Sequence, residues 1–540
     1  MFLILQKKLK KHFVKKVSSI TNMITSKFTS EIKKLVLSNH SLIFCFGLAL
    51  FLILLTKFLF DFGPFISTDI VDYSRMARDV SNGFFPHSSS FSPGYPFFIG
   101  ITSKIFGIHE SKSIFIWVFV LLFSTIILVF NFIRLNFKNE SLSFTKLALI
   151  SFVFLSHWAI LKVLITAHAD ALFLALLIGY FYFLFMWLST YKLKWFVFST
   201  LYAGLCIWVK YNGLILLPFL IIASLIFGKN KFKFQLLILP IVIAFASYFS
   251  FKTINGSVIK HFQGTNFFDK LEFAVQNLGL LYSNLVLSGR VYFGILFTNS
   301  IQLVTPDWVA FTFFIILLLL FFLYFFFSKM NKKIENVLLY FSFFYWFSFF
   351  VLCQYTSYEE IDTRTLMPSI LSFILWIIFI FKSLKKNIQY LIGFVVVLNL
   401  AYSFYFIGIL NLSTDRKNTF NYISNFSNRK SIIELKKLQK SYNFKDRIYT
   451  NEIRNVLYAL DYSGVNRYPT SRIFVNGKFR ELNIQEYDKI RQKFCNYFST
   501  HTCAVVLIDC PKSKIEKRLQ TNYSKIYYIE NDILLINVLK

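Results

Sequence analysis

The chain has 540 residues, of which 56% are hydrophobic and only 16% are charged. Lys and Arg outnumber Asp and Glu by 58 to 27, a balance that could indicate a nucleic-acid-binding protein. The mean hydropathy of +0.56 argues against that class, because such proteins are polar. Long apolar stretches instead predict a polytopic α-helical membrane protein, whose spans satisfy their own backbone hydrogen bonds.

Residues 1–40 contain nine Lys and a single acid, Glu31, and we interpret them as a basic cytoplasmic segment. The first predicted span follows at about 41–60. Lys210 to Gly213 interrupt a long apolar stretch and divide it into two spans. With the first, we expect about eleven spans, the others centred on 114–133, 147–163, 169–188, 196–209, 213–227, 235–251, 308–327, 337–353, 366–381 and 389–410.

The charges of the loops predict the orientation of these spans. Every second loop is short and basic, as in the segment with Lys382, Lys385 and Lys386, which indicates the cytoplasmic side. The opposite loops carry most of the acids. We therefore expect a multi-pass protein of the cell membrane (the inner membrane in a Gram-negative cell), with the N-terminus cytoplasmic and the C-terminus extracytoplasmic. The transmembrane part, 41–411, would then contain a first outer loop at 61–112 and another at 254–307, the latter with interfacial helices.

Residues 412–540 are mostly polar and predict a small extracytoplasmic α/β domain. The spacing in 431–441 is helical, 446–450 and 504–508 have the pattern of short strands, and 526–529 with 533–538 suggest a closing hairpin. Cys495, Cys503 and Cys510 also lie in this part. Three cysteines cannot all pair with one another, and the sequence leaves their disulfide state open, as it does the oligomeric state.

The first outer loop holds the densest group of polar side chains. Tyr73, Ala77 and Val80 recur at helical spacing, so they predict one face of a helix. Asp69 and Asp72 stand at its start, where a carboxylate suits the helix dipole. From spacing alone, Asp69 is as well explained by capping that helix as by catalysis.

This arrangement resembles the GT-C superfamily of membrane glycosyltransferases. The resemblance rests on an acid after span one, a Tyr four residues on, a helix with small residues and Arg, and the segment Ser92-Pro93-Gly94-Tyr95-Pro96. More narrowly, it points to bacterial relatives of protein O-mannosyltransferases and of the lipid A aminoarabinose transferase. The resemblance implies that Asp69, with Asp72 as second candidate, is catalytic.

Further segments agree with the resemblance in order along the chain. Asp170 opens a span in the way the family's second acid does, so it is also a predicted catalytic residue. Lys210-Tyr211-Asn212-Gly213 is similar to the family's Arg-Tyr-x-Gly turn, with Lys in place of Arg. Arg364-Thr365-Leu-Met-Pro368 is similar to Arg-Tyr-x-x-Pro, with Thr365 in place of the aromatic residue.

Transfer of a sugar from a phosphate needs a base and cations that hold the departing phosphate. Arg364 is the leading phosphate ligand, because a guanidinium binds phosphate through two hydrogen bonds. Lys210 and Arg75 are the other candidates. For Lys210 the alternative is extension of its ammonium to the membrane interface, and for Arg364 a local ion pair with Glu359, Glu360 or Asp362. We expect the substrate pocket to include Tyr73, Tyr95, His168 and Tyr211.

The resemblance implies an inverting hexosyl- or pentosyltransferase whose donor is a sugar on polyprenyl phosphate. The acceptor is a lipid, a glycan or a protein, membrane lipids are further partners, and no nucleic acid is expected. Asp69, His168 and Asp170 could together bind a divalent cation, Mg or Mn, although no closed ligand set is visible.

Two other functions are compatible with many spans. A polysaccharide polymerase or ligase also has outer loops with Arg, but usually lacks the early Asp-to-Tyr loop. A transporter or flippase would show polar or broken helices near the bilayer centre and internal repeats, whereas the acids here gather at one face.

Overall fold

The computed structural model describes Leu55, Phe444, Val456, Leu460 and residues 68–86, 92–108, 110–136, 144–165, 169–227, 237–255, 278–296, 305–327, 336–355, 361–381, 384–412, 429–442, 447–451, 465–469, 472–475, 478–481, 483–510 and 524–538. The basic segment 1–40 and, apart from Leu55, the first predicted span at 41–60 lie outside these residues.

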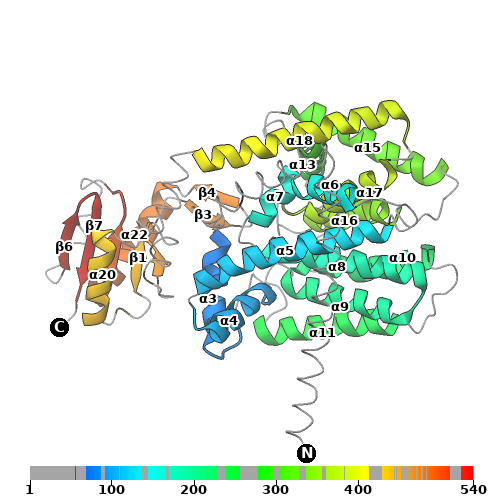
Figure 1. Cartoon of the computed structure of the whole chain (residues 1–540). Coiled ribbons are helices and arrows are strands. Elements are labelled where there is room, and N and C mark those ends of the chain that lie inside the picture. Colours follow the sequence, from blue (N-terminus) through cyan, green and yellow to red (C-terminus); the bar gives the residue numbers. More distant parts are fainter. Residues whose placement is uncertain are drawn as a thin grey trace, which may run out of the picture.

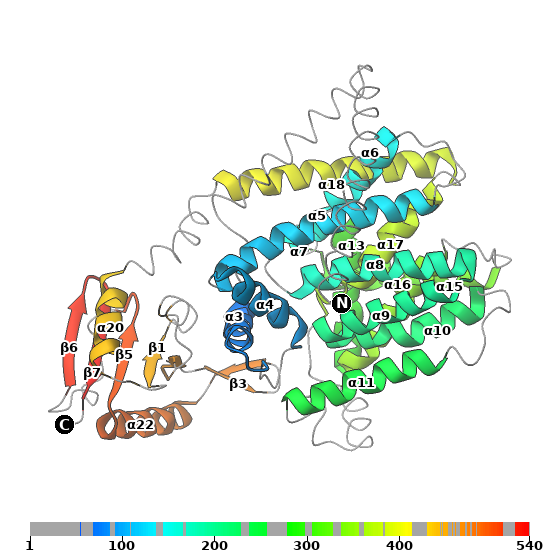
Figure 2. The ribbon, with the colours of Figure 1, turned by 60° about the horizontal axis from the view of Figure 1, so that its bottom comes forward.

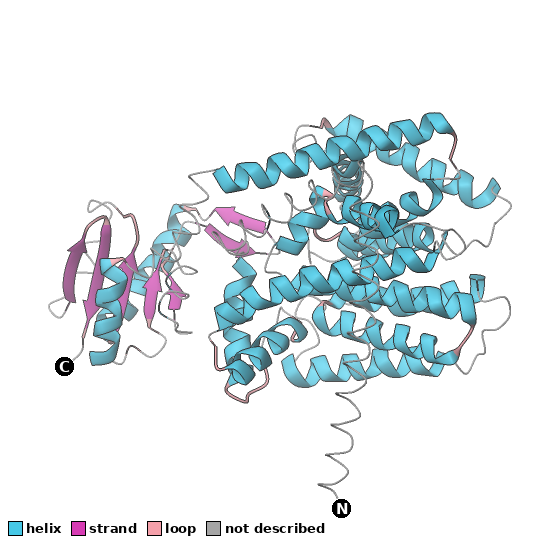
Figure 3. Ribbon diagram, in the orientation of Figure 1, coloured by secondary structure: helices cyan, strands magenta, loops and turns pink. Residues whose placement is uncertain are grey.

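A helical bundle forms the larger part of the molecule, and all strands among the described residues lie in the C-terminal part (Figures 1 and 3). The helices are α3 (Thr68–Ser81), α4 (Gly94–Phe106), α5 (Glu110–Asn136), α6 (Phe144–Leu155), α7 (Trp158–Ile165), α8 (Ala169–Thr190), α9 (Leu193–Val209), η1 (Tyr211–Ile215), α10 (Leu216–Phe227), α11 (Ile238–Asn255), α13 (Leu278–Leu296), α15 (Asp307–Phe327), α16 (Asn336–Tyr355), α17 (Met367–Ile380) and α18 (Lys386–Leu412).

Several of these helices are membrane spans by length and composition. Five qualify among the described residues: Ile116–Leu135, Ala169–Thr190, Asp307–Tyr324, Asn336–Cys353 and Lys386–Tyr405. Helices α9, α17, the first half of α11 and the continuous η1–α10 are apolar but shorter. α8 lies at the centre of the bundle and is largely buried, whereas α15 and α18 expose most of their apolar side chains, as lipid-facing helices do. The chain is therefore a multi-pass membrane protein.

The predicted interruption at Lys210 is confirmed. Lys210 adopts an extended conformation (φ −151°, ψ 130°) that ends α9, and the short 3₁₀ helix η1 leads into α10. The turn is tight, because a Cβ on Gly213 would lie 2.5 Å from the backbone nitrogen of Ile207. Only glycine therefore fits at this position without moving the turn.

The predicted span over 147–163 is not one continuous helix, because the helix breaks at Ser156–His157 into α6 and α7. Three hydrogen bonds to distant helices stabilise the break. His157 and Trp158 bond through ring nitrogens to the carbonyl oxygens of Ile295 and Gly294, at 3.0 and 3.2 Å, and Ser403 donates to the carbonyl of Ser156. The two rings, one at the break and one at the start of α7, thus satisfy carbonyls in the last turn of α13 that the helix itself leaves open.

Part of the predicted outer loop at 254–307 is helix α13, which packs within the bundle. A Cβ on Gly289 would overlap the backbone of Ala310, so α13 and α15 are in close contact. Trp346 of α16 donates to the hydroxyl of Ser288 at 3.0 Å.

The C-terminal part contains the helix and strands predicted for it. Its five-stranded sheet has the order β2-β1-β5-β7-β6, with β1, β2 and β5 parallel and β7 antiparallel to β5 and β6. A hairpin of β3 and β4 stands apart. The elements are α20 (Lys430–Ser441), β1 (Ile448–Thr450), β2 (Val465–Arg467), β3 (Arg472–Val475), β4 (Lys478–Glu481), α22 (Ile484–Thr500), β5 (Cys503–Leu507), β6 (Ser524–Ile529) and β7 (Asp532–Asn537).

Strand β5 is buried on both faces because a helix covers each of them. Ala504 and Val506 face the cluster that contains α20, while Val505 and Leu507 face the cluster that contains Phe498 of α22. This explains the continuous apolar run of the strand. Helix α22, which we did not predict, begins with a capping box between Asn483 and Glu486. Figure 2 shows α20 and α22 on opposite sides of the sheet.

Candidate functional site

Asp170 lies in the first turn of α8, at the end of the bundle that also holds the start of α17. Its residue surface is only 8% exposed. Burying a carboxylate is unfavourable unless it is paired, and the positive end of the α8 dipole offsets only part of the desolvation free energy. Two cations from distant parts of the chain also stabilise the Asp170 carboxylate.

The first cation is Lys210, at the end of α9. Its Nζ lies 2.7 Å from Oδ1 of Asp170, and its side chain is 14% exposed. The extended backbone at Lys210 and the tight turn at Gly213 hold the side chain in this position. The ammonium is thus buried and engaged by a carboxylate, which differs from the expected alternative of free extension toward the membrane interface.

The second cation is Arg364, in the turn before α17. Its Nε lies 3.9 Å from Oδ2 of Asp170, and its side chain is 35% exposed. The turn is fixed by reciprocal bonds: the Thr365 amide donates to the Asp362 carboxylate at 2.7 Å, and the Asp362 amide donates to the Thr365 hydroxyl at 3.0 Å. Thr365 therefore has a structural role in this turn in place of an aromatic residue.

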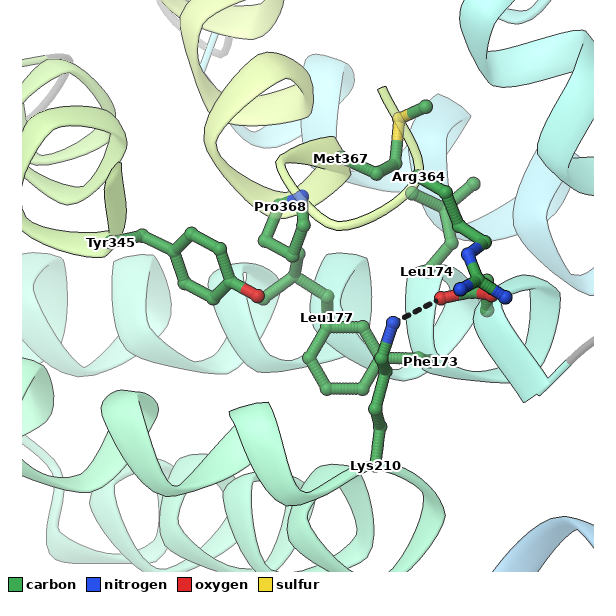
Figure 4. Close-up of a pocket in the computed structure, with 9 residues that line it drawn as sticks. Phe173, Leu174, Leu177, Lys210, Tyr345, Arg364, Met367 and Pro368 are labelled. Carbon is green, nitrogen blue, oxygen red and sulfur yellow. Dashed lines mark hydrogen bonds and ion pairs between the residues drawn. The ribbon is translucent and has the colours of Figure 1, made fainter. Parts of the chain in front are cut away.

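These three charged side chains line one pocket (Figure 4). In Figure 4, Lys210 reaches up from below and the guanidinium of Arg364 lies beside the carboxylate that Lys210 contacts. The remaining lining residues are apolar or aromatic: Phe173, Leu174, Leu177, Tyr345, Met367 and Pro368. The Tyr345 hydroxyl donates to the carbonyl of Thr365 at 3.3 Å, which ties α16 to the same turn.

The charge of this pocket favours an anion. Among the described residues that line the pocket, one carboxylate faces two cations, so these three side chains carry a formal positive charge, and Arg364 is the more exposed of the two cations. A guanidinium that is partly exposed can bind phosphate or carboxylate through two parallel hydrogen bonds. The apolar walls strengthen that attraction, because they lower the local dielectric constant.

The first outer-loop segment packs beside this site, and none of its described side chains lines the pocket. A Cβ on Gly94 would lie 2.7 Å from the carbonyl oxygen of Trp208, so α4 begins directly against the end of α9. Tyr73 and Tyr95 are buried and meet edge to face, with ring centroids 5.3 Å apart. Tyr211 is also buried in the bundle core.

The other predicted residues lie at or beyond the limits of the described part. Helix α3, which begins at Thr68, contains Asp69, Asp72 and Arg75. The structure describes their backbone but not their side chains. His168 is outside it entirely. Within the described residues no group of three His, Cys, Asp or Glu could hold a metal ion. The predicted set of Asp69, His168 and Asp170 is not covered by that search.

Asn212 is a polar residue that our reading of the sequence did not select for the site. It is 3% exposed, and its Nδ2 has no hydrogen-bond partner among the described residues. A buried amide without an acceptor costs about 1–3 kcal/mol. Asn212 stands two residues after Lys210 but is not among the described residues that line the pocket. Burial, which could have identified it, cannot be read from the sequence.

Part of the chain matches a known protein family. Residues 90–251 match the model of the dolichyl-phosphate-mannose-protein mannosyltransferase family. The match runs from α4 into α11 and includes Asp170 and Lys210, but neither Asp69 nor Arg364. No curated protein matches the chain. The family match and the apolar helices agree with the resemblance in the sequence, since this part of the chain is similar to membrane mannosyltransferases of the GT-C type.

Proposed function

We propose that this protein transfers a sugar from a polyprenyl-phosphate donor to a lipid, glycan or protein acceptor, with inversion at the anomeric carbon. The observation that carries the proposal is the pocket in which Asp170 holds Lys210 and Arg364. A pocket with excess positive charge, at the end of membrane helices, suits an anionic headgroup attached to a lipid.

In the proposed reaction the acceptor hydroxyl attacks the anomeric carbon, and the bond from that carbon to the phosphate oxygen breaks. The electron pair stays on the phosphate, which leaves as polyprenyl phosphate, and the hydroxyl proton passes to a carboxylate. Arg364 and Lys210 stabilise the charge that develops on the phosphate. Arg75 is a further candidate ligand for it. Asp69 is the proposed base, with Asp72 as the alternative.

Asp170 would position both cations. A divalent cation at Asp69, His168 and Asp170 is the competing arrangement, and it requires Asp170 to release Lys210. Treatment with EDTA separates the two: activity that survives chelation supports the Lys210–Arg364 arrangement, and activity restored only by Mg²⁺ or Mn²⁺ supports the metal.

We further propose that the pocket faces the extracytoplasmic side of the cell membrane. Arg134, Lys192 and Lys194 lie at the ends of α5, α8 and α9 that are opposite to Asp170. Lys385 and Lys386 lie at the start of α18. Basic residues mark the cytoplasmic ends of spans, so the site end would be extracytoplasmic.

The test is transfer in proteoliposomes with defined polyprenyl-phosphate sugars. Arg364→Lys keeps the charge and loses the two-bond contact, so we expect the KM for the donor to rise about tenfold. Arg491→Lys on α22 is the matched control and should leave the reaction unchanged. Asp69→Asn should lower turnover about 100-fold.

Movement of an intact sugar-lipid across the membrane, with no polyprenyl phosphate formed, would instead identify a flippase. Consumption of diphosphate-linked donors alone would identify a polymerase or ligase. Normal turnover by Asp69→Asn would make Asp72 the leading base.

A further inference from the structure

Four large apolar side chains are exposed at one end of the α3–α4 pair. Phe84 and Phe85 follow α3 and are 69% and 60% exposed, while Ile105 and Phe106 end α4 and are 70% and 67% exposed. We call these four residues the apolar foot. Exposed to water, each would forgo most of the roughly 1.5–3 kcal/mol that burial of such a side chain contributes.

The packing of α3 against α4 brings the four residues to the same end. The two helices run in the same direction: Tyr73 contacts Tyr95, and a Cβ on Gly100 would overlap Ala77 and Val80. Residues separated by about 20 to 23 positions are therefore neighbours. The end of α3 thus lies beside the last turn of α4, so the turn that carries Phe84 and Phe85 and the turn that carries Ile105 and Phe106 belong to the same end of the pair.

Both turns that present the foot have a defined backbone. Gly83 and Gly107 adopt positive φ angles, of 90° and 61°, which end α3 and α4. The amide of Phe84 donates to the carbonyl of Asp79 at 2.8 Å, and the amide of Ile108 donates to that of Ser103 at 3.1 Å. The backbone of both turns therefore fixes the four side chains of the apolar foot in exposed positions.

The α3–α4 pair lies at the level where the apolar helices of the bundle end. Phe97 of α4 contacts Trp208 in the last turn of α9, with ring centroids 5.0 Å apart. In Figure 1, α3 lies across the direction of α5 and α8 at the end of the bundle. Trp308, 70% exposed in the first turn of α15, is an aromatic residue of the kind that marks a membrane–water interface.

We propose that the apolar foot inserts into the membrane leaflet on the side of the Asp170 pocket, at the boundary of headgroups and acyl chains. Lys104 is exposed next to Ile105, and a basic residue beside apolar ones suits an anionic lipid surface. The inserted foot anchors the pair that carries Asp69 and Gly94 to the bilayer. This inference needs only that the chain spans a membrane, and it is independent of the proposed reaction.

The experiment is photocrosslinking of the full chain in vesicles of equal parts phosphatidylethanolamine and phosphatidylglycerol. Phe84 and Phe106 are replaced one at a time by p-benzoylphenylalanine, a larger aromatic residue that exposed positions accept. Phe394, 60% exposed on the spanning helix α18, is the lipid-facing control. Ile484, 82% exposed at the start of α22, is the control outside the spans.

Mass spectrometry should find lipid adducts at Phe84 and Phe106 in yields similar to those at Phe394 and several-fold above those at Ile484. Yields at both positions equal to that at Ile484 would overturn the proposal. Crosslinks from both positions into the protein chain itself would also overturn it, because the foot would then be covered by protein.

Discussion

Asp170 pairs with two cations, Lys210 and Arg364, whose side chains differ in exposure, and this difference suggests that they have different roles. Lys210 is nearly buried and close enough for a direct hydrogen bond, so it neutralises the carboxylate. Arg364 is more exposed and farther from the carboxylate, so more of its guanidinium can meet a ligand. The sequence has Lys210 where the family's turn has Arg. The structure shows that this Lys pairs with Asp170.

At the residue scale, removal of Asp170 and removal of the whole ion pair should differ. Asp170→Leu leaves the buried Lys210 ammonium without its partner, which should lower the stability by about 3 kcal/mol. The double variant Asp170→Leu/Lys210→Met replaces the pair with apolar side chains and should recover most of that loss. Thermal unfolding in detergent measures both.

Neither variant should transfer sugar, because the positioning of Arg364 and the charge of Lys210 are gone. If the double variant keeps the donor KM and the turnover, the ion pair has only a structural role. Separate measurement of stability and of KM keeps these two roles distinct.

At the element scale, the turn between α9 and α10 determines where Lys210 points. Gly213→Ala would bring a Cβ within 2.5 Å of the Ile207 nitrogen and 2.6 Å of the Cys206 carbonyl carbon. We expect a loss of about 1–3 kcal/mol from overpacking, together with weaker donor use as Lys210 shifts. Gly393→Ala on α18 is the control, since its Cβ meets nothing within 4 Å.

The control should be neutral or slightly stabilising, because Ala is favoured over Gly in a helix. If Gly213→Ala unfolds at the same temperature as Gly393→Ala and keeps the donor KM, the turn is not the element that positions Lys210.

Helices α6 and α7 show at the same scale why the sequence did not predict a break. The polar residues Ser156, His157 and Lys162 interrupt the apolar pattern of 147–163 only briefly, and such short interruptions also occur within continuous helices. The break is decided by His157 and Trp158, whose partners on α13 lie 138 and 136 residues away along the chain. Contacts over such a separation form only once the bundle has assembled.

At the scale of the whole molecule, the direction of α18 connects the orientation of the bundle to the C-terminal sheet. Reporter fusions after Asn387 and after Leu412 should lie on opposite sides of the membrane, because α18 runs from Lys386 to Leu412. Alkaline phosphatase, active outside the cytoplasm, should be active only at the second position. Activity at both positions would contradict the proposed orientation of the site.

The C-terminal sheet should lose stability in alkali. Burial raises the pKa of Tyr449 and of Tyr468 to about 12, and that of the Cys503 thiol to about 12. Because the folded-state pKa values are raised, this stability is complete below the ordinary pKa values of 10.0 and 9.0. It falls as the pH rises toward 12, since the unfolded chain ionises first.

Tyrosinate absorbance and circular dichroism against pH will check this expectation. Tyr468→Phe removes one of the ionising groups, so it should make the alkaline loss shallower. A loss of equal steepness in that variant would show that Tyr468 does not contribute.

The sequence by itself determined the membrane class, the positions of most helices and the strands predicted at 446–450, 504–508, 526–529 and 533–538. These features depend on local hydrophobic patterns, which the chain carries wherever it folds. The resemblance of its segments to the GT-C superfamily also selected Asp170, Lys210 and Arg364.

Only the tertiary structure decided that these three side chains meet, across 40 residues in one case and 194 in the other. It also decided that the buried Nδ2 of Asn212 has no hydrogen-bond partner among the described residues, that the 147–163 helix breaks, and that the apolar foot lies at one end of α3 and α4. The physical reason is common to all four. Distance, burial and partnership are properties of packed helices, and they arise only when segments remote in the chain come into contact.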